Sequence, residues 1–304
     1  MTMCGKNNTQ ERKEPTDMKK CIAIGLLAFI CLLTGCMGTA DIKETSGNET
    51  TLHCPEIEET TLIDNEDVTI TIDKLEYSAI YDMYAMETHI QNHSTRTLNY
   101  SSKCANVNGY TISALALGDV YGGMEADVQI GLPRQELQLA DIKAIQEIGV
   151  EIECVYDDNG DSAGYAAGTI LTSAYGTYTQ EHSFTGTEAY NTADYRIVVA
   201  PSENPTVESP VIVFIENHTD FPIMLFYDSI AINQKMAVSY MSGPYVMPHS
   251  CRLEQLDTSL FGNNLEEEAV ETTTLSFVIL PYRPDGNFST ADTIETPTVT
   301  VKAE

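Results

Sequence analysis

A five-residue phrase occurs twice in this chain, and the repetition limits what the chain can fold into. Residues 90–94 read IQNHS and residues 215–219 read IENHT. Laying 90–108 on 215–233 without a gap also matches Asn108 with Asn233 and several apolar positions between them. Looser matches follow in the same order further along the chain. Such an ordered series indicates an internal duplication in which each copy is one structural module.

Segments around both phrases alternate apolar and polar residues, as half-buried β-strands do. Residues 68–72, 211–215 and 275–279 are examples, rich in β-branched and aromatic side chains. Residues 158–160 (DNG) and 284–286 (PDG) lie at matching places in the two copies and are typical of hairpin turns. We therefore predict an all-β protein with two tandem immunoglobulin-like β-sandwiches, at 62–182 and 183–304.

Each copy is also predicted to hold one short helical turn, at 141–148 and at 265–270, capped by Asp141 and Asn264. The repeated phrases themselves contain the markers Asn92, His93, Asn217 and His218. An asparagine at the end of a strand bonds backbone groups that have lost their ladder partners. We interpret the markers as structural, since a metal site built on His89 and His93 has Phe214 opposite His89 in the second copy.

The start of the chain has the features of a secretory signal peptide, residues 1–35. A basic Met18-Lys19-Lys20 precedes an apolar run over 21–33, which is too short to span a bilayer. The run ends in Leu33, Thr34, Gly35 and Cys36, which resemble the bacterial lipobox. That resemblance implies cleavage by signal peptidase II before Cys36 and a diacylglyceryl group on its sulfur. Residues 1–17 are either an over-called start before Met18 or a long head region.

Beyond Cys36 the chain is polar, and composition limits its partners. Residues 36–61 are predicted to form the lipidated cysteine and a flexible linker, a disordered stalk below the sandwiches. The formal net charge of −29 makes nucleic acid a poor partner and leaves a cation or a basic partner as an open alternative. No cysteine pair has the C-x-x-C spacing of a zinc site, and we expect no cofactor besides the lipid.

The layout over residues 66–304 resembles the Ig-like modules of unknown function in surface lipoproteins of Gram-positive bacteria. In those modules an apolar strand ending in Asn-x-Ser/Thr precedes a strand ending in an Asn-Gly-like turn. Asn92 and Asn217 fit the first feature, and Asn108-Gly109 fits the second better than Asn233-Gln234 does. The resemblance implies a fold and no activity.

Three motifs suggest chemistry. Residues 160–164 satisfy G-x-S-x-G around Ser162, but a nucleophile elbow needs a helix after it, and 168–173 is predicted to be a strand. The same loop offers oxygen ligands as a weak calcium candidate, namely Asp157, Asp158, Asn159 and Asp161. The positions of the second copy that match Cys104 and Cys154 hold no cysteine. The two cysteines therefore form either a disulfide that was gained or lost as a unit, or two free buried thiols.

Taken together, these features predict a lipid-anchored protein on the extracytoplasmic face of the bacterial cell membrane. We expect a non-catalytic binding or structural interaction module that meets the membrane through its lipid and recognises an unknown protein or surface ligand. The alternatives are an envelope hydrolase using Ser162, or an accessory solute-binding lipoprotein of a transporter. The latter needs alternating strands and helices, which the sequence does not show.

The anchor gives a first prediction. Cys36→Ala removes the sulfur that carries the lipid, so metabolic labelling with a radioactive fatty acid is expected to fall to background. The protein is then expected to stay uncut or to be shed. Normal labelling of the variant would contradict the lipobox assignment.

Overall fold

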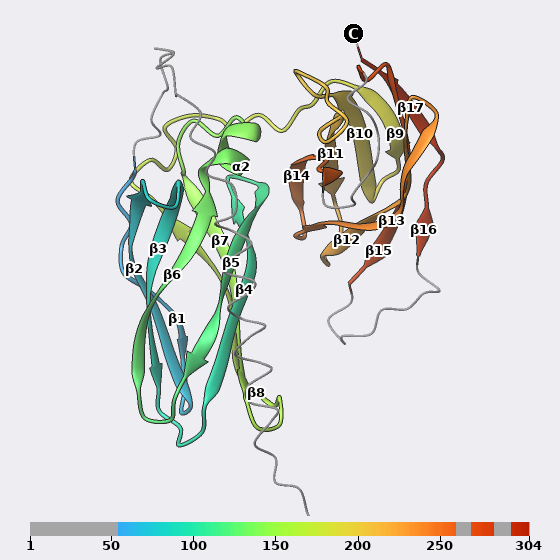
Figure 1. The fold of residues 1–304 in the computed structure, drawn as a ribbon. Helices are drawn as coiled ribbons and strands as arrows, with labels where there is room; N and C mark the ends of the chain where they lie inside the picture. The colour runs from blue at the N-terminus through green and yellow to red at the C-terminus, as the bar shows by residue number, and fades with distance from the viewer. Residues whose placement is uncertain (1–53, 260–268, 283–292, 304) are drawn as a thin grey trace, which may run out of the picture. The chain divides into compact units, whose positions relative to one another are not determined.

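The computed structural model describes residues 54–259, 269–282 and 293–303, all of which belong to one compact unit, Thr51–Glu304 (Figure 1). The prediction of an all-β protein is confirmed, since strands form nearly all of the regular structure of these residues and α2 (Arg134–Leu139) is their one α-helix. None of the helices in the described part is long and apolar enough to cross a membrane.

Strands β1–β8 make up the first half of the described chain. Their bounds are β1 Thr60–Asp64, β2 Val68–Ser78, β3 Met83–Asn92, β4 Leu98–Val107, β5 Tyr110–Val120, β6 Glu125–Pro133, β7 Glu147–Tyr156 and β8 Ser162–Leu171.

The remaining strands make up the second half. Their bounds are β9 Thr187–Asn191, β10 Tyr195–Pro201, β11 Val211–Asn217, β12 Ile223–Ile232, β13 Lys235–Val246, β14 Ser250–Gln255, β15 Thr272–Pro281, β16 Ile294–Glu295 and β17 Val299–Lys302.

The strand order is the same in both halves. In the first half β1-β2-β3-β6 form one sheet and β8-β7-β4-β5 form the facing layer. In the second half β9-β10-β11-β14 correspond to the former, and β16-β15-β12-β13, with β17 also on β15, correspond to the latter. The layer β8-β7-β4-β5 continues into β14-β11-β10-β9 as one eight-stranded sheet. The repeat seen in the sequence is therefore a repeat of topology.

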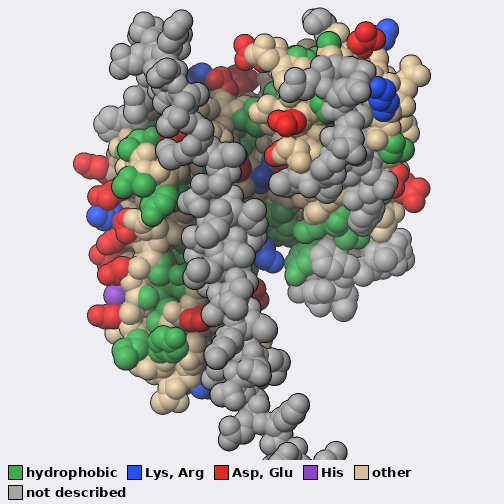
Figure 2. All heavy atoms as spheres, viewed as in Figure 1, with side chains coloured by type: hydrophobic (Ala, Val, Ile, Leu, Met, Phe, Trp, Pro, Cys, Tyr) green, Lys and Arg blue, Asp and Glu red, His purple; other side chains and the backbone are tan. Residues whose placement is uncertain are grey.

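Each half has its own apolar core between its two layers. Strand β2 places Val68, Ile70 and Ile72 in the first core, all fully buried. Strand β11 places Val213 and Ile215 in the second, against Tyr227 and Phe277. The two-residue spacing of these apolar positions is what one buried face of a sheet requires. Asp and Glu side chains gather along β2, β3 and β6 at the left edge of Figure 2.

Both repeated asparagines end a strand and make the same hydrogen bonds. The Asn92 amide donates to the carbonyls of Arg96 (2.7 Å) and Val120 (2.8 Å), and its Oδ1 accepts from the Ser94 N–H (3.0 Å). Asn217 donates to the carbonyls of Phe221 (2.9 Å), Met247 (3.0 Å) and Val246 (3.3 Å) and accepts from the Thr219 N–H (3.1 Å). Both asparagines are 1% exposed, so their side-chain amides find their partners in the protein rather than in water.

The neighbouring histidines also have equal backbone roles. The His93 N–H donates to the Asp67 carbonyl (2.8 Å), and the His218 N–H donates to the Asp194 carbonyl (2.9 Å). Each bond joins the end of the strand to the turn before the preceding strand.

A second pair of equivalent asparagines holds the turn after the next strand. Asn108 and Asn233 both have left-handed backbone, at φ +51° and +48°. Asn108 donates to the Ala144 carbonyl (2.7 Å), and Asn233 donates to the Ala269 carbonyl (2.8 Å). The residue after Asn233 is Gln234, which takes φ +66° where the first half has a glycine. The second turn therefore keeps its shape despite an unfavourable residue.

Two predicted boundaries are wrong. The helix of the first half, α2, ends at Leu139, before the predicted turn at 141–148, and it starts after Pro133. Asp141 has φ +52°, a conformation that follows a helix, whereas a cap before one is extended. The linker predicted through residue 61 is also too long, because Ile57 bridges Thr172 and β1 begins at Thr60. Backbone pairing outweighs the polar composition there.

Several predictions lie outside the described residues. They are the signal peptide 1–35 with Leu33–Cys36, the linker up to residue 53, the second helical turn at 265–268 with its cap Asn264, and the turn at 284–286.

The asparagine bonds give a second prediction. Asn92→Ala removes the hydrogen bonds to the Arg96 and Val120 carbonyls and the acceptor of the Ser94 N–H, which is expected to lower the free energy of unfolding by about 2–4 kcal/mol. Asn217→Ala is expected to cost about as much, because Asn217 makes the equivalent bonds in the second half. Guanidinium denaturation followed by circular dichroism measures both. Asn99, whose side chain bonds only the surface side chain of Asp119, is the control and is expected to cost below about 0.5 kcal/mol as Ala. Equal losses at Asn92 and Asn99 would contradict the structural role.

Candidate functional site

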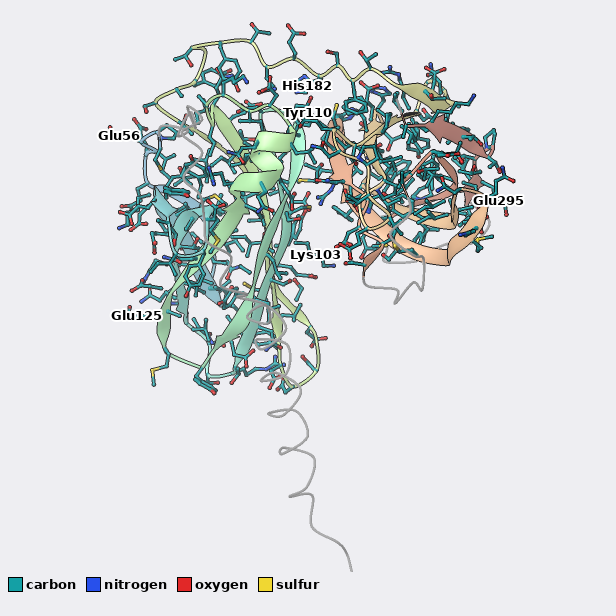
Figure 3. The ribbon with its side chains drawn as sticks, turned by 45° about the horizontal axis from the view of Figure 1, so that its top comes forward. Glu56, Lys103, Tyr110, Glu125, His182 and Glu295 are labelled. Carbon is teal, nitrogen blue, oxygen red and sulfur yellow. The ribbon has the colours of Figure 1, made fainter. Side chains whose placement is uncertain are left out.

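A cleft of about 550 Å³ with walls from both halves is the best candidate site, and we call it the tyrosine cleft. Strand β4 supplies one wall, and its residue Lys103 is labelled in Figure 3. Strands β7 and β8 extend that wall, and three residues of the second half face it. The lining residues are Ser101, Ser102, Lys103, Cys104, Glu151, Glu153, Tyr165, Pro222, Tyr245 and Tyr282.

Strand alternation explains why charged side chains line this wall. On β7, Ile152 and Cys154 are buried in the first core. Glu151 and Glu153 alternate with them and so project from the opposite face of the sheet. The register pairs Glu153 with Tyr165 on β8 and with Ser101 on β4. One outer face of three strands thus presents carboxylates beside a tyrosine.

The aromatic side chains of the cleft come from both halves. Tyr165 is 60% exposed, and it lies on β8 near the Glu151 carboxylate of β7. Burial, with a smaller effect of Glu151, raises the pKa of Tyr165 to about 12. Burial also raises the pKa of Tyr245, on β13, with a smaller contribution from Glu151. These phenols are therefore neutral hydrogen-bonding groups with accessible ring surface.

The carboxyl and thiol groups of the cleft have raised pKa values. Burial raises the pKa of Glu151, and the nearby Tyr165 hydroxyl partly offsets that rise. Burial raises the pKa of the Cys104 thiol to about 12, with Glu151 adding to it. Because the thiolate is the nucleophilic form, Cys104 is unreactive near neutral pH. The tyrosine cleft therefore has polar and aromatic groups that can hold a ligand, and its lining thiol is not activated.

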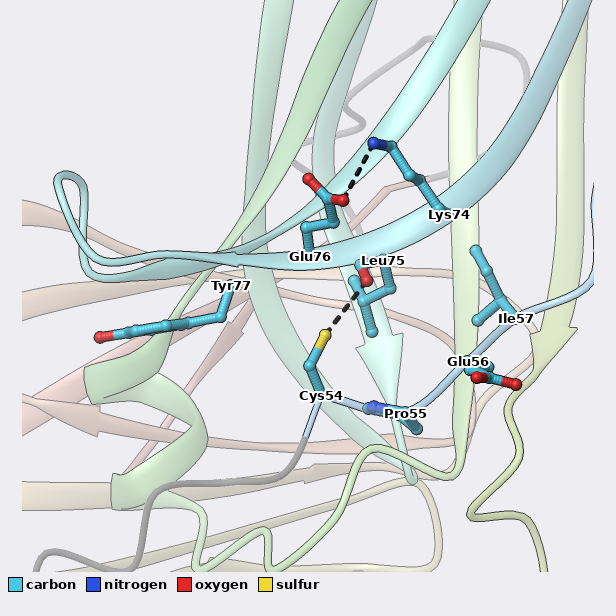
Figure 4. Close-up of a pocket in the computed structure, with 8 residues that line it drawn as sticks. All are labelled: Cys54, Pro55, Glu56, Ile57, Lys74, Leu75, Glu76 and Tyr77. Atoms are coloured by element: carbon cyan, nitrogen blue, oxygen red, sulfur yellow. Dashed lines mark hydrogen bonds and ion pairs between the residues drawn. The ribbon is translucent and has the colours of Figure 1, made fainter.

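A second cleft, of about 520 Å³, lies beside β2 and is shown in Figure 4. Its polar groups are already engaged with one another. The Cys54 thiol donates to the Leu75 carbonyl (3.1 Å), and Lys74 pairs with Glu76 (2.9 Å). Burial raises the pKa of Cys54, so its thiolate is disfavoured. This cleft is a weaker candidate than the tyrosine cleft.

The G-x-S-x-G sequence does not form a nucleophile elbow. Gly160 has φ +72° in the tight turn between β7 and β8, and Ser162 is the exposed first residue of β8. A strand rather than a helix follows the serine, so the geometry that activates such a serine in α/β-hydrolases is missing.

The predicted weak calcium loop is occupied by an arginine. Arg96 forms an ion pair with Asp158 and donates to the side-chain Oδ1 of Asn159 (2.7 Å), while the Asn159 side-chain amide donates to the Asp161 carboxylate. The Arg96 guanidinium also lies 3.6 Å from the centre of the Tyr156 ring. No group of three or more potential metal-ligating acids, histidines and cysteines occurs in the described parts of the chain.

His89 and His93 are engaged separately. The His89 Nδ1 lies 2.8 Å from Asp127 on β6, and the His93 Nε2 lies 2.8 Å from the Thr69 hydroxyl on β2. These partners belong to strands on opposite sides of β3, so the two histidine rings do not share a partner.

Cys104 and Cys154 are both free thiols, so the alternative of a disulfide between them is wrong. The register pairs Cys154 with Tyr100, four residues along β4 from Cys104. That separation is about 13 Å at the usual rise per residue, well beyond the reach of a disulfide. Cys154 also belongs to the first core, whereas Cys104 lines the tyrosine cleft. The sequence comparison of the two copies did not reveal this difference of face.

No protein-family model matches this chain, and no curated protein matches it.

Sequence reasoning did not find the tyrosine cleft. Its residues come from four strands and two further positions in the chain, and no motif or spacing links them. The nearest signal was Glu151 and Glu153, outward positions of a strand whose other face is apolar. Two outward-facing glutamates are common on strands that face solvent. They do not indicate a cleft unless the second half is known to lie opposite them.

The buried thiols give a third prediction. At pH 8 the native protein is expected to alkylate at Cys104, Cys154 and Cys251 more than about a hundredfold more slowly than a free thiol, because burial raises their pKa to about 12, 11 and 12. Iodoacetamide labelling with peptide mass spectrometry measures each site. The same sites in denatured protein are the control and are expected to react at the ordinary rate. Rapid labelling of the native sites would contradict their burial.

Proposed function

We propose that this protein is a lipid-anchored, non-catalytic binding protein on the extracytoplasmic face of a bacterial membrane, and that its ligand site is the tyrosine cleft. The observation that carries the proposal is the composition of the cleft: accessible tyrosine rings beside carboxylates, with walls from both halves. Pockets of this volume with a few convergent polar groups are the usual form of a ligand site.

We also propose that the two halves, 62–182 and 183–304, are tandem Ig-like sandwiches. The repeated strand order and the equal bonds of Asn92 and Asn217 support a duplicated module. The two layers of each half resemble the two antiparallel sheets of an Ig-like sandwich. Such sandwiches present their strands as stable scaffolds for surface recognition.

The two alternatives have less support. An envelope hydrolase would use Ser162, which opens a strand after a hairpin turn. A solute-binding component of a transporter would alternate strands with helices, whereas the described residues contain a single α-helix of six residues. The cleft also offers no thiolate near neutral pH.

The anchor and location rest on the sequence. A diacylglyceryl group on Cys36 would hold the protein durably, because two acyl chains bind a membrane far more strongly than one. The net charge of −29 would keep the protein soluble above the membrane and disfavours nucleic acid, so we propose a protein or surface ligand as the partner.

The site gives a fourth prediction. The full chain, tagged and purified in detergent, is incubated with an extract of the native envelope, and the bound material is compared between variants. Tyr165→Leu removes the exposed ring and is expected to reduce capture at least fivefold. Tyr175→Leu is the matched control, since Tyr175 is 59% exposed and does not line the cleft. Equal capture by both variants would place binding elsewhere and contradict the proposed function.

A further inference from the structure

We propose that the tyrosine cleft binds an organic cation, namely the ammonium or guanidinium group of a lysine or arginine side chain on a basic peptide. This inference rests on the proposed function and names the class of ligand. It follows from three features of the cleft: its aromatic rings, its balance of charge and its size.

Aromatic rings are the first feature. Tyr165, Tyr245 and Tyr282 enter the cleft from both halves, and a cation within about 6 Å of such a ring centre is attracted by its negative face. The chain already uses this contact elsewhere, where Arg96 lies 3.6 Å from the centre of the Tyr156 ring. That guanidinium also pairs with Asp158, so ring and carboxylate act on one cation together. The cleft repeats this combination of groups without an arginine among its lining residues.

The balance of charge is the second feature. Glu151 and Glu153 contribute two carboxylates to the lining, and Lys103 contributes one ammonium. Glu153 is exposed, and Glu151 lies near Tyr165 on the neighbouring strand. An anionic ligand would meet two like charges, whereas a cation meets one, from Lys103 at the exposed rim. The high acidity of the whole chain also draws cations towards its surface.

Size is the third feature. A volume of about 550 Å³ admits one or two long side chains with their peptide backbone at the opening. Lysine and arginine carry apolar methylene stems that can lie along tyrosine rings while the charged end reaches a carboxylate. The cleft therefore suits a segment of basic peptide better than a small inorganic cation, for which no cluster of ligating groups occurs in the described residues.

Calorimetric titration of the full chain in detergent tests the inference with a defined probe, trilysine blocked at both ends. Saturable binding is expected, and the same peptide acetylated on its three side chains is expected not to bind. Tyr165→Leu is expected to weaken the binding of trilysine about fivefold, while Tyr175→Leu leaves it unchanged. Lys103→Gln removes a like charge and is expected to strengthen binding about threefold, while Lys302→Gln, exposed on β17, does not.

Equal effects within each matched pair would show that trilysine binds the acidic surface at large, and they would overturn the inference. Binding of the acetylated peptide as tight as that of trilysine would overturn it too, in favour of a neutral ligand. If Tyr165→Leu abolishes capture from the envelope but trilysine does not bind, the proposed function stands and the cationic class is wrong. If neither depends on Tyr165, both fail. Guanidinium denaturation of each variant verifies that the fold is intact.

Discussion

The tyrosine cleft depends on the join between β5 and β14, where the two halves form one sheet. The Cys251 N–H donates to the Gly109 carbonyl (2.9 Å), and the hydroxyls of Thr111 and Ser250 lie 2.6 Å apart, both buried. In an antiparallel ladder alternate amides point away from the partner strand, so β14 can pair with β11 on one side and meet β5 on the other. Strand β4 lies beside β5 and supplies one wall of the cleft, while β13, which carries Tyr245, leads into β14. The cleft exists because this short parallel bridge holds the two walls.

Arg252, next to the join, connects β14 with α2 and β5 through an ion pair and a hydrogen bond. Arg252, 12% exposed, lies 3.3 Å from Glu254 and 3.5 Å from Glu136 of α2, and it donates to the Ser113 hydroxyl (3.2 Å). Burial raises the pKa of Glu254, opposed by Arg252, so the carboxylate depends on this arginine for its charge. Replacing the arginine would leave carboxylates together in a poorly solvated place, a mechanism that costs several kcal/mol in other proteins. Tyr110, also near the join, packs against His182 with the two rings tilted and 5.0 Å between their centres, which ties the connecting segment to β5 (Figure 3).

The limits of the sequence are clear from particular residues. Alternating strands, hairpin turns and the duplication were predictable, because they depend on local patterning and on the two copies of one phrase. Asn92 and Asn217 were predictable as strand ends, since a buried asparagine between a strand and a turn has carbonyls to satisfy. The position of α2 was not predictable. Aspartate is a common residue type at the start of a helix, but Asp141 has the backbone conformation of a residue that follows one. The cleft was not predictable either, since Tyr165 and Tyr245 meet only when β5 and β14 join, and the copies do not contain a signal for that join.

Amide hydrogen exchange in the full chain tests the join most directly. The amides of Cys251 and Met247 are the ones to follow, because they donate across the halves, to the Gly109 carbonyl and to the Thr111 hydroxyl (2.9 Å). If the join holds in solution, both exchange as slowly as amides within the ladder of β11 and β14, such as that of Ile215. If both exchange at the rate of an unprotected amide while Ile215 stays protected, the halves are not joined at β5 and β14. The tyrosine cleft would then have no fixed walls, and its assignment as the ligand site would be contradicted.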